Sequence, residues 1–355
     1  MTPPRALRAD ADYIPVHLRR FVFHSQDDFY VSRHFDPLLL SHLMYEGFLP
    51  IASEFQDQCL LLPKLHRQRC LLLFKRDEPE HVPKIVRKRA KKFTFVLNRD
   101  FDRVIAGCHE KHGIPWLYPP IVKSFKTLFN AGNAGIELYP GIRVRFFTVE
   151  LYDVVTDSLV AGELGYTVGS VYTSLTGFSR ANGAGTVQLH ALSKFLYLAG
   201  FKMWDLGMSM SYKMSLGAKD FKRDMFLDLL YKWRSQQVLM KLNGNKEEND
   251  VGMGVVVKSL FDPSKPSLEI TAKSEDGNEE QQKEHIAGNL ANELKDETDT
   301  KDHAMNDTTD EKREAGAKRK LSLGDRHQGE DKKGKSKVDA SLTSEADILV
   351  NKNDN

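Results

Sequence analysis

The hydrophobic positions are most regular between residues 178 and 226, where a glycine-rich turn precedes a helix, a buried strand and a second helix. Gly200 favours the end of the first helix, because glycine adopts the left-handed conformation at little cost. The apolar run from Phe201 to Leu206 predicts a short strand, with Asp205 near its carboxyl end. The helix itself, from about Gly185 to Ala199, is predicted by apolar side chains at helical spacing: Val187, Ala191, Leu192, Phe195 and Leu196.

Three alternating segments precede this region and predict an antiparallel β-meander. They run from Arg143 to Tyr152, from Leu159 to Thr167 and from Val171 to Thr176, with turn residues between them. Gly162 and Gly165 interrupt the second segment, which indicates a bulge or the close approach of another backbone. We expect the following helix to pack back on this sheet and the short strand after it to join the sheet.

The first part of the chain has shorter periodic segments. Pro37 and the leucines after it predict a short helix from Phe35 to Met44. The prolines from Pro79 to Pro83 break the pattern and indicate a domain boundary. Short apolar runs predict strands at residues 21–23, 51, 60–62, 71–74 and 93–97, and helical spacing predicts helices at residues 99–109, 121–129 and 224–233.

The composition changes near residue 244, where polar and charged residues become dominant and aromatic residues almost disappear after Phe261. Such a segment cannot bury enough apolar surface to offset the entropy lost on ordering. We therefore expect a mostly disordered tail, with a weak apolar patch from Val251 to Leu260 as a short docking element. The tail also carries basic clusters of the nuclear-targeting or nucleic-acid-attracting kind, at Lys318 to Lys320 and Lys332 to Lys337, but acids are interleaved with them.

The chain of 355 residues is long enough for one large domain or two modest ones. The patterns predict an α+β fold with four parts. These are a flexible N-terminus at residues 1–12, a small α+β domain at residues 13–82, a larger domain at residues 83–242 and the disordered charged tail at residues 243–355.

Charge and cysteine content narrow the class of protein. The net charge is only +2, and the three cysteines, Cys59, Cys70 and Cys108, lack the spacing of a metal site. An odd number of cysteines argues for a reducing compartment and against a disulfide framework. No apolar run is long enough to span a bilayer, and the first 15 residues lack the apolar core of a signal peptide. We therefore expect a cytoplasmic, monomeric protein that makes no contact with membranes.

Two single residues invite a functional interpretation. A carboxylate at Asp205, near the end of a buried strand, must be solvated, hydrogen-bonded or functional, because an unpaired buried charge is too costly. The simpler interpretation is that Asp205 caps the next turn. Trp116, in a loop rich in large apolar groups, either fills the core or walls a pocket for a flat or apolar ligand.

The densest basic run of the folded part is KIVRKRAKK, at residues 84–92. Its cations are either a solvated helix face or a stripe that binds the phosphates of a nucleic acid. The residues assigned to the second interpretation are Lys84, Arg87, Lys88, Lys91 and Lys92.

The sequence lacks the motifs of several well-known catalytic and binding sites. The sequence has no GxxxxGK[ST] loop, no HExxH, no paired CxxC and no GxSxG. No metal site is expected. The residues alone therefore indicate an α+β domain with a basic stripe, an aromatic loop and one unexplained acid.

The order of motifs in the central part resembles the leucyl/phenylalanyl-tRNA–protein transferases over roughly Tyr45 to Trp233. The most specific match is Ser215-Leu216-Gly217-Ala218 with Arg223 and Phe226, which fits the family signature SLGAxxxxRxx[YF]. The supporting matches follow the family's order: Gly47-Phe48-Leu49-Pro50, His81-Val82, Trp116-Leu117, Val149-Glu150-Leu151, Gly162-Glu163-Leu164-Gly165, Phe178-Ser179-Arg180, Gly200-Phe201 and Asp205.

The sequence departs from the family pattern at four places. Gly207 stands where the family has a glutamine two residues after Asp205, and Leu175 stands where it has a glutamate. These two changes bear on acceptor specificity and on activity itself. The third departure is the helix start, which reads Ala184-Gly185-Thr186 here and ASK in the family. The fourth is Ile51, which replaces a tryptophan of the family and would change the shape of the donor pocket.

The resemblance implies a fold, an activity and a set of site residues. Family members have a small N-terminal domain and an N-acetyltransferase-like (GNAT-like) domain, here a mixed sheet with flanking helices. They move an amino acid from aminoacyl-tRNA to a protein N-terminus. For this chain we expect transfer of an apolar residue of the Leu, Phe or Met type to an acceptor with a basic N-terminal residue, which marks the acceptor for degradation, without a cofactor.

The same resemblance assigns roles to individual residues. Asp205 would orient or deprotonate the attacking amine, and backbone amides from Gly207 to Ser209 would stabilise the oxyanion. Trp116 and Phe178 would line an apolar pocket, and the basic run at residues 84–92 would hold the tRNA acceptor stem. Glu150 or Glu163 would replace the missing glutamate. Ser179 and Ser215 complete the expected substrate-binding set.

Two alternatives keep the fold but change the function. The first is a catalytically inactive RNA-binding module, motivated by Gly207 and Leu175. The second is an acetyl-CoA-dependent N-acetyltransferase, for which residues 180–185 are a partial match to a pyrophosphate-binding turn.

Overall fold

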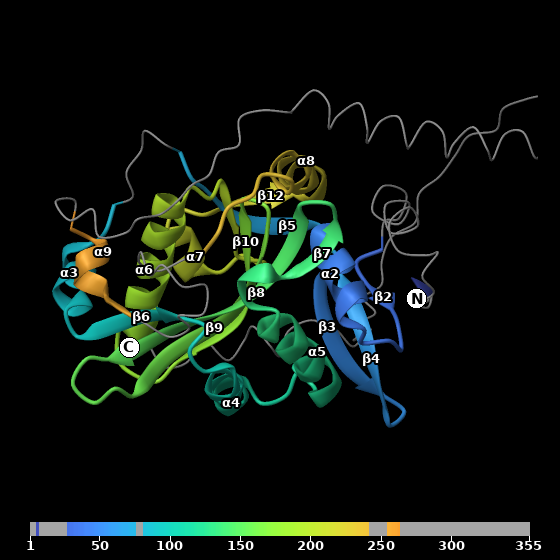
Figure 1. The fold of residues 1–355 in the computed structure, drawn as a ribbon, viewed down its shortest axis with the longest axis horizontal. Helices are drawn as coiled ribbons and strands as arrows, with labels where there is room; N and C mark the ends of the chain where they lie inside the picture. The colour runs from blue at the N-terminus through green and yellow to red at the C-terminus, as the bar shows by residue number, and fades with distance from the viewer. Residues whose placement is uncertain (1–4, 7–26, 76–80, 241–253, 263–355) are drawn as a thin grey trace, which may run out of the picture. The chain divides into compact units, whose positions relative to one another are not determined.

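The computed structural model describes residues 5–6, 27–75, 81–240 and 254–262 (Figure 1). All of these residues lie in one compact unit. The predicted strand at residues 21–23 lies outside these ranges. The predicted flexible N-terminus and disordered tail also lie outside them, apart from residues 5–6 and 254–262.

A mixed sheet of nine strands dominates the described part of the chain, with the strand order β12–β5–β11–β10–β9–β8–β6–β13 and with β7 beside β8 (Figure 1). Its strands are β5 (Gln68–Leu73), β6 (Phe93–Leu97), β7 (Ile136–Tyr139), β8 (Ile142–Asp153), β9 (Leu159–Val168), β10 (Val171–Ser179), β11 (Met203–Asp205), β12 (Lys219–Lys222) and β13 (Val255–Val256). The predicted meander is confirmed, because β8, β9 and β10 pair antiparallel in sequence order.

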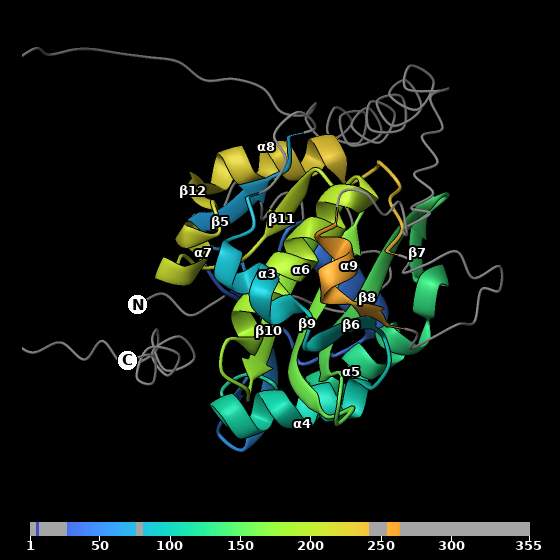
Figure 2. The same ribbon diagram turned by 90° about the vertical axis from the view of Figure 1, so that its left-hand side faces the viewer.

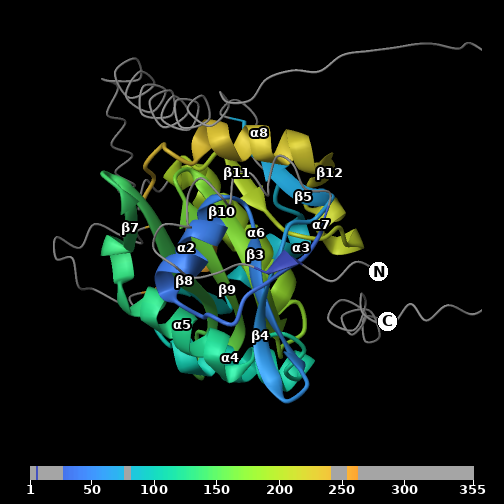
Figure 3. The same cartoon turned by 90° about the vertical axis from the view of Figure 1, so that its right-hand side faces the viewer.

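Helices cover both faces of this sheet (Figures 2 and 3). One face carries α2 (Pro37–Tyr45), α4 (Phe101–His112), α5 (Pro119–Asn130) and α8 (Arg223–Trp233), whose apolar side chains share a core with Phe146 and Leu164. The other face carries α3 (Lys84–Ala90), α6 (Ala184–Ala199) and α9 (Val257–Leu260), whose core includes Phe147 and Trp204. The expected mixed α+β fold with flanking helices is therefore confirmed.

Helix α6 connects β10 to the parallel strand β11 and follows its predicted range closely. Val187, Ala191 and Leu192 are fully buried on the sheet, as their spacing predicts. Gly200 adopts φ +88°, and its N–H reaches the carbonyl groups of Leu196 and Tyr197. The glycine therefore ends the helix and turns the chain into β11.

The segment before residue 82 contributes to several structures. β3 (Leu49–Phe55) and β4 (Gln58–Lys64) form a hairpin, and β1 (Arg5–Ala6) pairs with β2 (Tyr30–Val31). β5 lies between β11 and β12 in the large sheet. The predicted domain boundary after residue 82 stays a prediction, and β5 shows that residues before it supply a strand to the large sheet.

Two short elements complete the described chain: the 3-10 turn η2 (Gly132–Ala134) and helix α7 (Ser211–Ser215). The predicted docking element is confirmed: β13 pairs with β6, and side chains of β13 and α9 enter the core. None of the helices in the described ranges combines the length and apolar character needed to cross a bilayer.

Candidate functional site

The large sheet splits where β10 and β11 part. The two parallel strands pair only from Val171–Met203 to Thr173–Asp205, and β10 then continues to Ser179 without a strand on that side within the described residues. A register shift between Ser174 and Thr176 marks a bulge at the start of the open segment. Ligands of open α/β sheets bind beyond the carboxyl ends of strands that part in this way, so the split is the first candidate site.

Asp205 ends β11 at this split and is fully buried. Its Oδ1 lies 3.1 Å from Arg69 Nε, and its Oδ2 lies 2.5 Å from Arg69 Nη2. Thr173 Oγ1 and the amide of Gly207 also donate to this carboxylate, at 3.4 and 2.9 Å. Both oxygens are therefore held by the protein, and neither is exposed to a substrate in this conformation.

Arg69 was not singled out by the sequence, yet it balances the charge of Asp205. It lies in β5 with no exposed surface, donates to the carbonyl of Gly47 at 3.2 Å and stacks on the Phe226 ring at 4.4 Å. Burial would lower the pKa of Arg69, but the charge and hydrogen bonds of Asp205 raise it above its usual value. The two side chains thus form a bidentate contact inside the core.

Gly207 adopts φ +74°, a conformation that a glutamine would enter only with strain. Its N–H is bound to Asp205, and its carbonyl accepts from the amide of Cys70 at 2.8 Å. The next residues are fixed by Lys213, whose Nζ donates to the carbonyls of Leu206 and Met208 at 2.8 and 2.7 Å. The loop after Asp205 is therefore anchored at both ends.

Glu150 is fully buried on β8 and is bound by the protein itself. Its Oε1 accepts from the amides of Arg99 and Asp100, at 2.8 and 2.9 Å, and from Thr148 Oγ1 at 2.6 Å. Its Oε2 accepts from the Tyr152 hydroxyl at 2.7 Å. This carboxylate organises the chain before α4.

Glu163 lies on β9 and is 6 % exposed. Tyr172 and Ser174 both donate to its Oε1 at 2.8 Å. Burial raises the pKa of Glu163 to about 7, against the opposing effects of these hydrogen bonds and of the Lys213 charge. It is a carboxyl group that changes its charge near neutral pH.

Asp205 and Glu163 lie on opposite faces of the sheet. Trp204, the neighbour of Asp205 in β11, packs in the core beside α6, and its Nε1 donates to Ser174 at 2.8 Å. Since side chains alternate along a strand, Trp204 and Glu163 share one face, and Asp205 points to the other. The structure does not bring these two carboxyl groups together.

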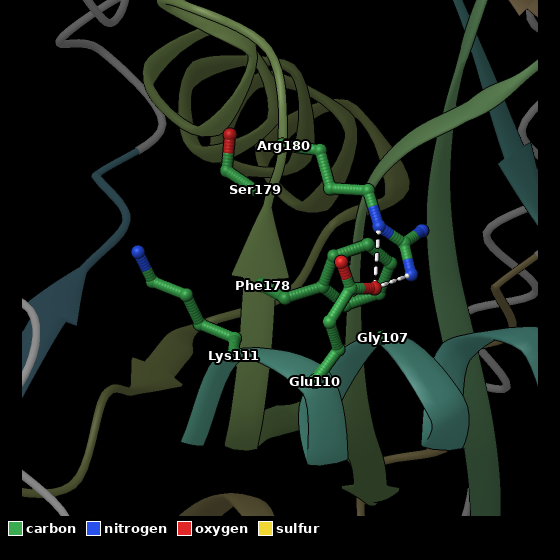
Figure 4. Close-up of a pocket in the computed structure, with 6 residues that line it drawn as sticks. All are labelled: Gly107, Glu110, Lys111, Phe178, Ser179 and Arg180. Carbon is green, nitrogen blue, oxygen red and sulfur yellow. Dashed lines mark hydrogen bonds and ion pairs between the residues drawn. The ribbon is translucent and has the colours of Figure 1, made fainter. Parts of the chain in front are cut away.

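A cavity of about 330 Å³ lies where the open segment of β10 meets α4 (Figure 4). Phe178, Ser179 and Arg180 line it from the strand side, and Gly107, Glu110 and Lys111 line it from α4. Arg180 forms an ion pair with Glu110 and lies 4.6 Å from the centre of the Phe178 ring. Figure 4 shows the side chains of Arg180 and Glu110 joined to each other, with the Lys111 side chain extending away from this pair.

Glycine at position 107 is required by the Phe178 ring. A Cβ at Gly107 would lie 2.4 Å from that ring, and one at Gly162 would lie 2.9 Å from it. At Gly162 the close neighbour is thus an aromatic side chain, where the sequence predicted a bulge or another backbone. The two predicted residues Phe178 and Ser179 both line the cavity, while Trp116 does not.

The remaining predicted residues lie elsewhere. Trp116 is half-buried in the loop between α4 and α5 and packs edge-on against Phe125. Ser215 is exposed in α7, and its hydroxyl donates to the carbonyl of Tyr212 at 2.8 Å. Arg223, the arginine of the matched signature, binds Asp28 at 2.6 Å and so ties the start of α8 to the N-terminal segment.

The predicted basic stripe forms α3 and the two residues after it, and all five assigned cations are exposed: Lys84, Arg87, Lys88, Lys91 and Lys92. Arg89 of the same helix lies against Gly183, where an added Cβ would be 2.1 Å from its Nη1. Gly183 precedes α6 and follows the end of β10. The basic helix therefore lies next to the turn that leaves the cavity, a proximity that the sequence did not reveal.

His112 is a second residue that the sequence pattern missed. Its Nε2 lies 2.8 Å from the carbonyl of Gly177, in the open segment of β10. A carbonyl only accepts, so Nε2 carries the proton, and the buried Nδ1 has no hydrogen-bond partner among the described residues. No three His, Cys, Asp or Glu side chains of the described chain gather closely enough to hold a metal ion.

Comparison with known proteins gives one consistent result. Residues 74–231 match the sequence model of the leucyl/phenylalanyl-tRNA protein transferase family. The leucyl/phenylalanyl-tRNA–protein transferase of Proteus mirabilis is 27 % identical over 157 residues, or 43 % of this chain and 62 % of the relative. The corresponding enzyme of Pectobacterium carotovorum is 30 % identical over 161 residues, or 44 % of this chain and 63 % of the relative.

The matched part spans less than two thirds of the length of these two relatives. It nevertheless includes the basic helix α3, the meander, both strands of the split and most of α8. The resemblance noted in the sequence is therefore confirmed: residues 74–231 are similar to the leucyl/phenylalanyl-tRNA protein transferase family.

Proposed function

We propose that this protein is an aminoacyl-tRNA–protein transferase, which moves an apolar amino acid of the Leu, Phe or Met type to the N-terminal residue of an acceptor protein. The family match over residues 74–231 carries the proposal, because it covers the split sheet and the basic helix together. The GNAT-like assignment belongs to the same proposal. It is supported by the helical crossover α6 between parallel strands that separate after three paired residues.

The reaction needs little covalent chemistry from the protein. The ester of aminoacyl-tRNA is already activated, so positioning the two substrates is the main task. The neutral α-amine of the acceptor attacks the ester carbonyl, a C–N bond forms, the C–O bond breaks, and the amine proton passes to the leaving ribose hydroxyl. The tetrahedral intermediate requires hydrogen-bond donors for its oxyanion.

We assign Asp205 a positioning role in this reaction. Both of its oxygens bind Arg69, and Oδ1 also holds the amide of Gly207. Using the carboxylate as a base would break an ion pair inside the core, which is strongly unfavourable. Because the Gly207 amide is already bound, the oxyanion donors that we expected after Asp205 are reduced to Met208 and Ser209.

The donor amino acid is placed at the open segment of β10, beside the cavity that Phe178 and Ser179 line. Phe178 supplies the apolar surface, and the loop anchored by Gly207 faces the same split. Trp116 and Ser215 stay in the proposed substrate-binding set, although neither lines this cavity. The tRNA acceptor stem is assigned to the exposed cations of α3, from Lys84 to Lys92.

The acceptor is proposed to carry a basic N-terminal residue and to be marked for degradation after transfer. Leu175 replaces the family's glutamate at the bulge of β10, so another carboxyl group has to meet that residue. Glu163 fits better than Glu150 by position, because its Oε1 is held by Ser174, next to Leu175. Glu150 has hydrogen bonds on both of its oxygens.

The direct test incubates the full chain with leucyl-, phenylalanyl- or methionyl-tRNA and a peptide that begins with arginine. We expect transfer to the free peptide and none to the same peptide with an acetylated N-terminus, because only a free amine can attack. Mass spectrometry of the peptide measures the product. Binding of tRNA without transfer would instead favour an inactive binding module, and turnover of acetyl-CoA would favour an acetyltransferase; either result contradicts the proposal.

The RNA interface predicts a charge-dependent affinity. Lys91→Glu should weaken tRNA binding and reduce the slope of log affinity against log salt by about one, because one phosphate contact and its released counterion are lost. Fluorescence anisotropy over a salt series measures both quantities. Lys123→Glu makes the same charge change in α5, on the opposite face of the sheet, and serves as the control. An unchanged affinity for Lys91→Glu would show that α3 is only a solvated surface.

Glu163 predicts a pH-dependent stability. The folded chain keeps the Glu163 proton up to a pKa of about 7, whereas an ordinary glutamate loses it near 4.5. The free energy of unfolding should therefore fall between about pH 5 and pH 8, by up to about 3 kcal/mol for this group. Glu163→Gln should remove this part of the pH dependence in denaturant titrations, and Glu54→Gln, at an exposed site, should not. Equal pH profiles for all three proteins would refute the assignment.

A further inference from the structure

A segment outside the family match returns to the large sheet. β13 pairs antiparallel with β6, with Val255 opposite Phe95 and Val256 opposite Thr94, and α9 follows it. The family match ends at residue 231. Residues 254–262, called here the C-terminal clip, therefore add a strand and a helical turn to the matched region.

The clip is held by its apolar side chains. Val257 is fully buried, and Val255 and Leu260 are 8 % and 2 % exposed. They share one core with Val86 and Ala90 of α3. Without the clip, β6 would be the outermost strand of this sheet within the described chain, with its backbone groups unpaired on that side.

Helix α3 depends on such packing for its position. It has only seven residues and no side-chain cap at its N-terminus. A helix this short is not stable alone, so tertiary contacts of its buried residues have to fix it. Those contacts come from α6 and α9, which lie beside α3 in Figure 2.

The three adjacent helices also carry basic residues and no acidic ones. Their sequences, KIVRKRA, AGTVQLHALSKFLYLA and VKSL, contain no aspartate or glutamate. Lys258 of α9 is exposed and Lys194 of α6 is half-buried, with its Nζ above the Tyr197 ring at 5.1 Å. Because these three helices contribute cations and no carboxylates, they favour the binding of a polyanion.

We propose that the C-terminal clip is part of the nucleic-acid interface. Val257 and Leu260 pack against the buried side of α3 and fix its position. Lys258 extends the cationic surface of α3 along the phosphate backbone of the bound RNA. This inference rests on the proposed tRNA-binding function of α3. It adds that RNA affinity depends on a segment that lies beyond the family match.

The experiment compares four variants of the full chain with the unaltered protein. Lys258→Glu reverses the exposed charge, Val257→Asp undocks the clip, Lys91→Glu reports on α3, and Lys123→Glu is the matched control on the opposite face. The probe is a tRNA transcript, and its binding is measured by anisotropy over a salt series. Thermal unfolding and hydrogen exchange of the Phe95 amide, which faces β13, are measured on the same samples.

We expect Lys258→Glu to weaken tRNA binding roughly threefold to tenfold at low salt and to reduce the salt slope by about one. Its unfolding temperature should stay unchanged, because the side chain is exposed. Val257→Asp should accelerate exchange at Phe95, whose amide faces β13, and also weaken binding. Lys123→Glu should leave affinity and exchange unchanged.

The controls distinguish the RNA-binding role of α3 from the contribution of the clip. If Lys91→Glu weakens binding while Lys258→Glu binds like the unaltered protein, the clip is only structural and this inference is overturned, with the RNA-binding role of α3 intact. If neither variant weakens binding, the RNA-binding role of α3 fails, and the inference fails with it. If Val257→Asp does not fold, Lys258→Glu decides alone.

Discussion

The ion pair between Arg69 and Asp205 is the contact on which the candidate site depends. It joins β5 to β11 inside the core, and both side chains are fully buried. Arg69 also reaches the carbonyl of Gly47 and the ring of Phe226, so four segments far apart in sequence meet at one guanidinium. Removing one partner of such a pair leaves an uncompensated charge and costs about 3–5 kcal/mol. The pair therefore fixes the carboxyl end of β11 at the place where β10 and β11 separate.

This constraint fixes the loop after β11 beside the open segment of β10, on which the proposed activity depends. Asp205 holds the loop after β11 through Gly207, and the open segment of β10 runs from the split to the cavity beside Phe178. The turn after that segment leads into α6, whose start lies against Arg89 of the basic helix. If α3 holds the donor RNA, as proposed, this turn connects the RNA site to the split sheet. Positioning, more than covalent chemistry, is what such a framework supplies.

The sequence predicted those parts of the fold that repeat locally. The meander and α6 follow alternating and helical spacing, so their positions were found within a few residues. Arg69 could not be found in this way, because its partner Asp205 is 136 residues away and no periodic pattern records a long-range contact. For the same reason the sequence did not show that Glu150 binds the amides of Arg99 and Asp100. The cavity depends on Gly107, whose meaning appears only when the Phe178 ring packs on it.

The central claim is that Asp205 acts through Arg69 and takes no part in proton transfer. The most direct measurement compares stability and aminoacyl transfer in Arg69→Met, Asp205→Leu and the double variant. Each single change leaves one buried charge, whereas an apolar pair of similar volume can replace a buried ion pair at little cost. The account predicts that the double variant regains stability and transfers at least about tenfold faster than either single variant. A double variant that folds like the unaltered protein but transfers no faster than Asp205→Leu would contradict it.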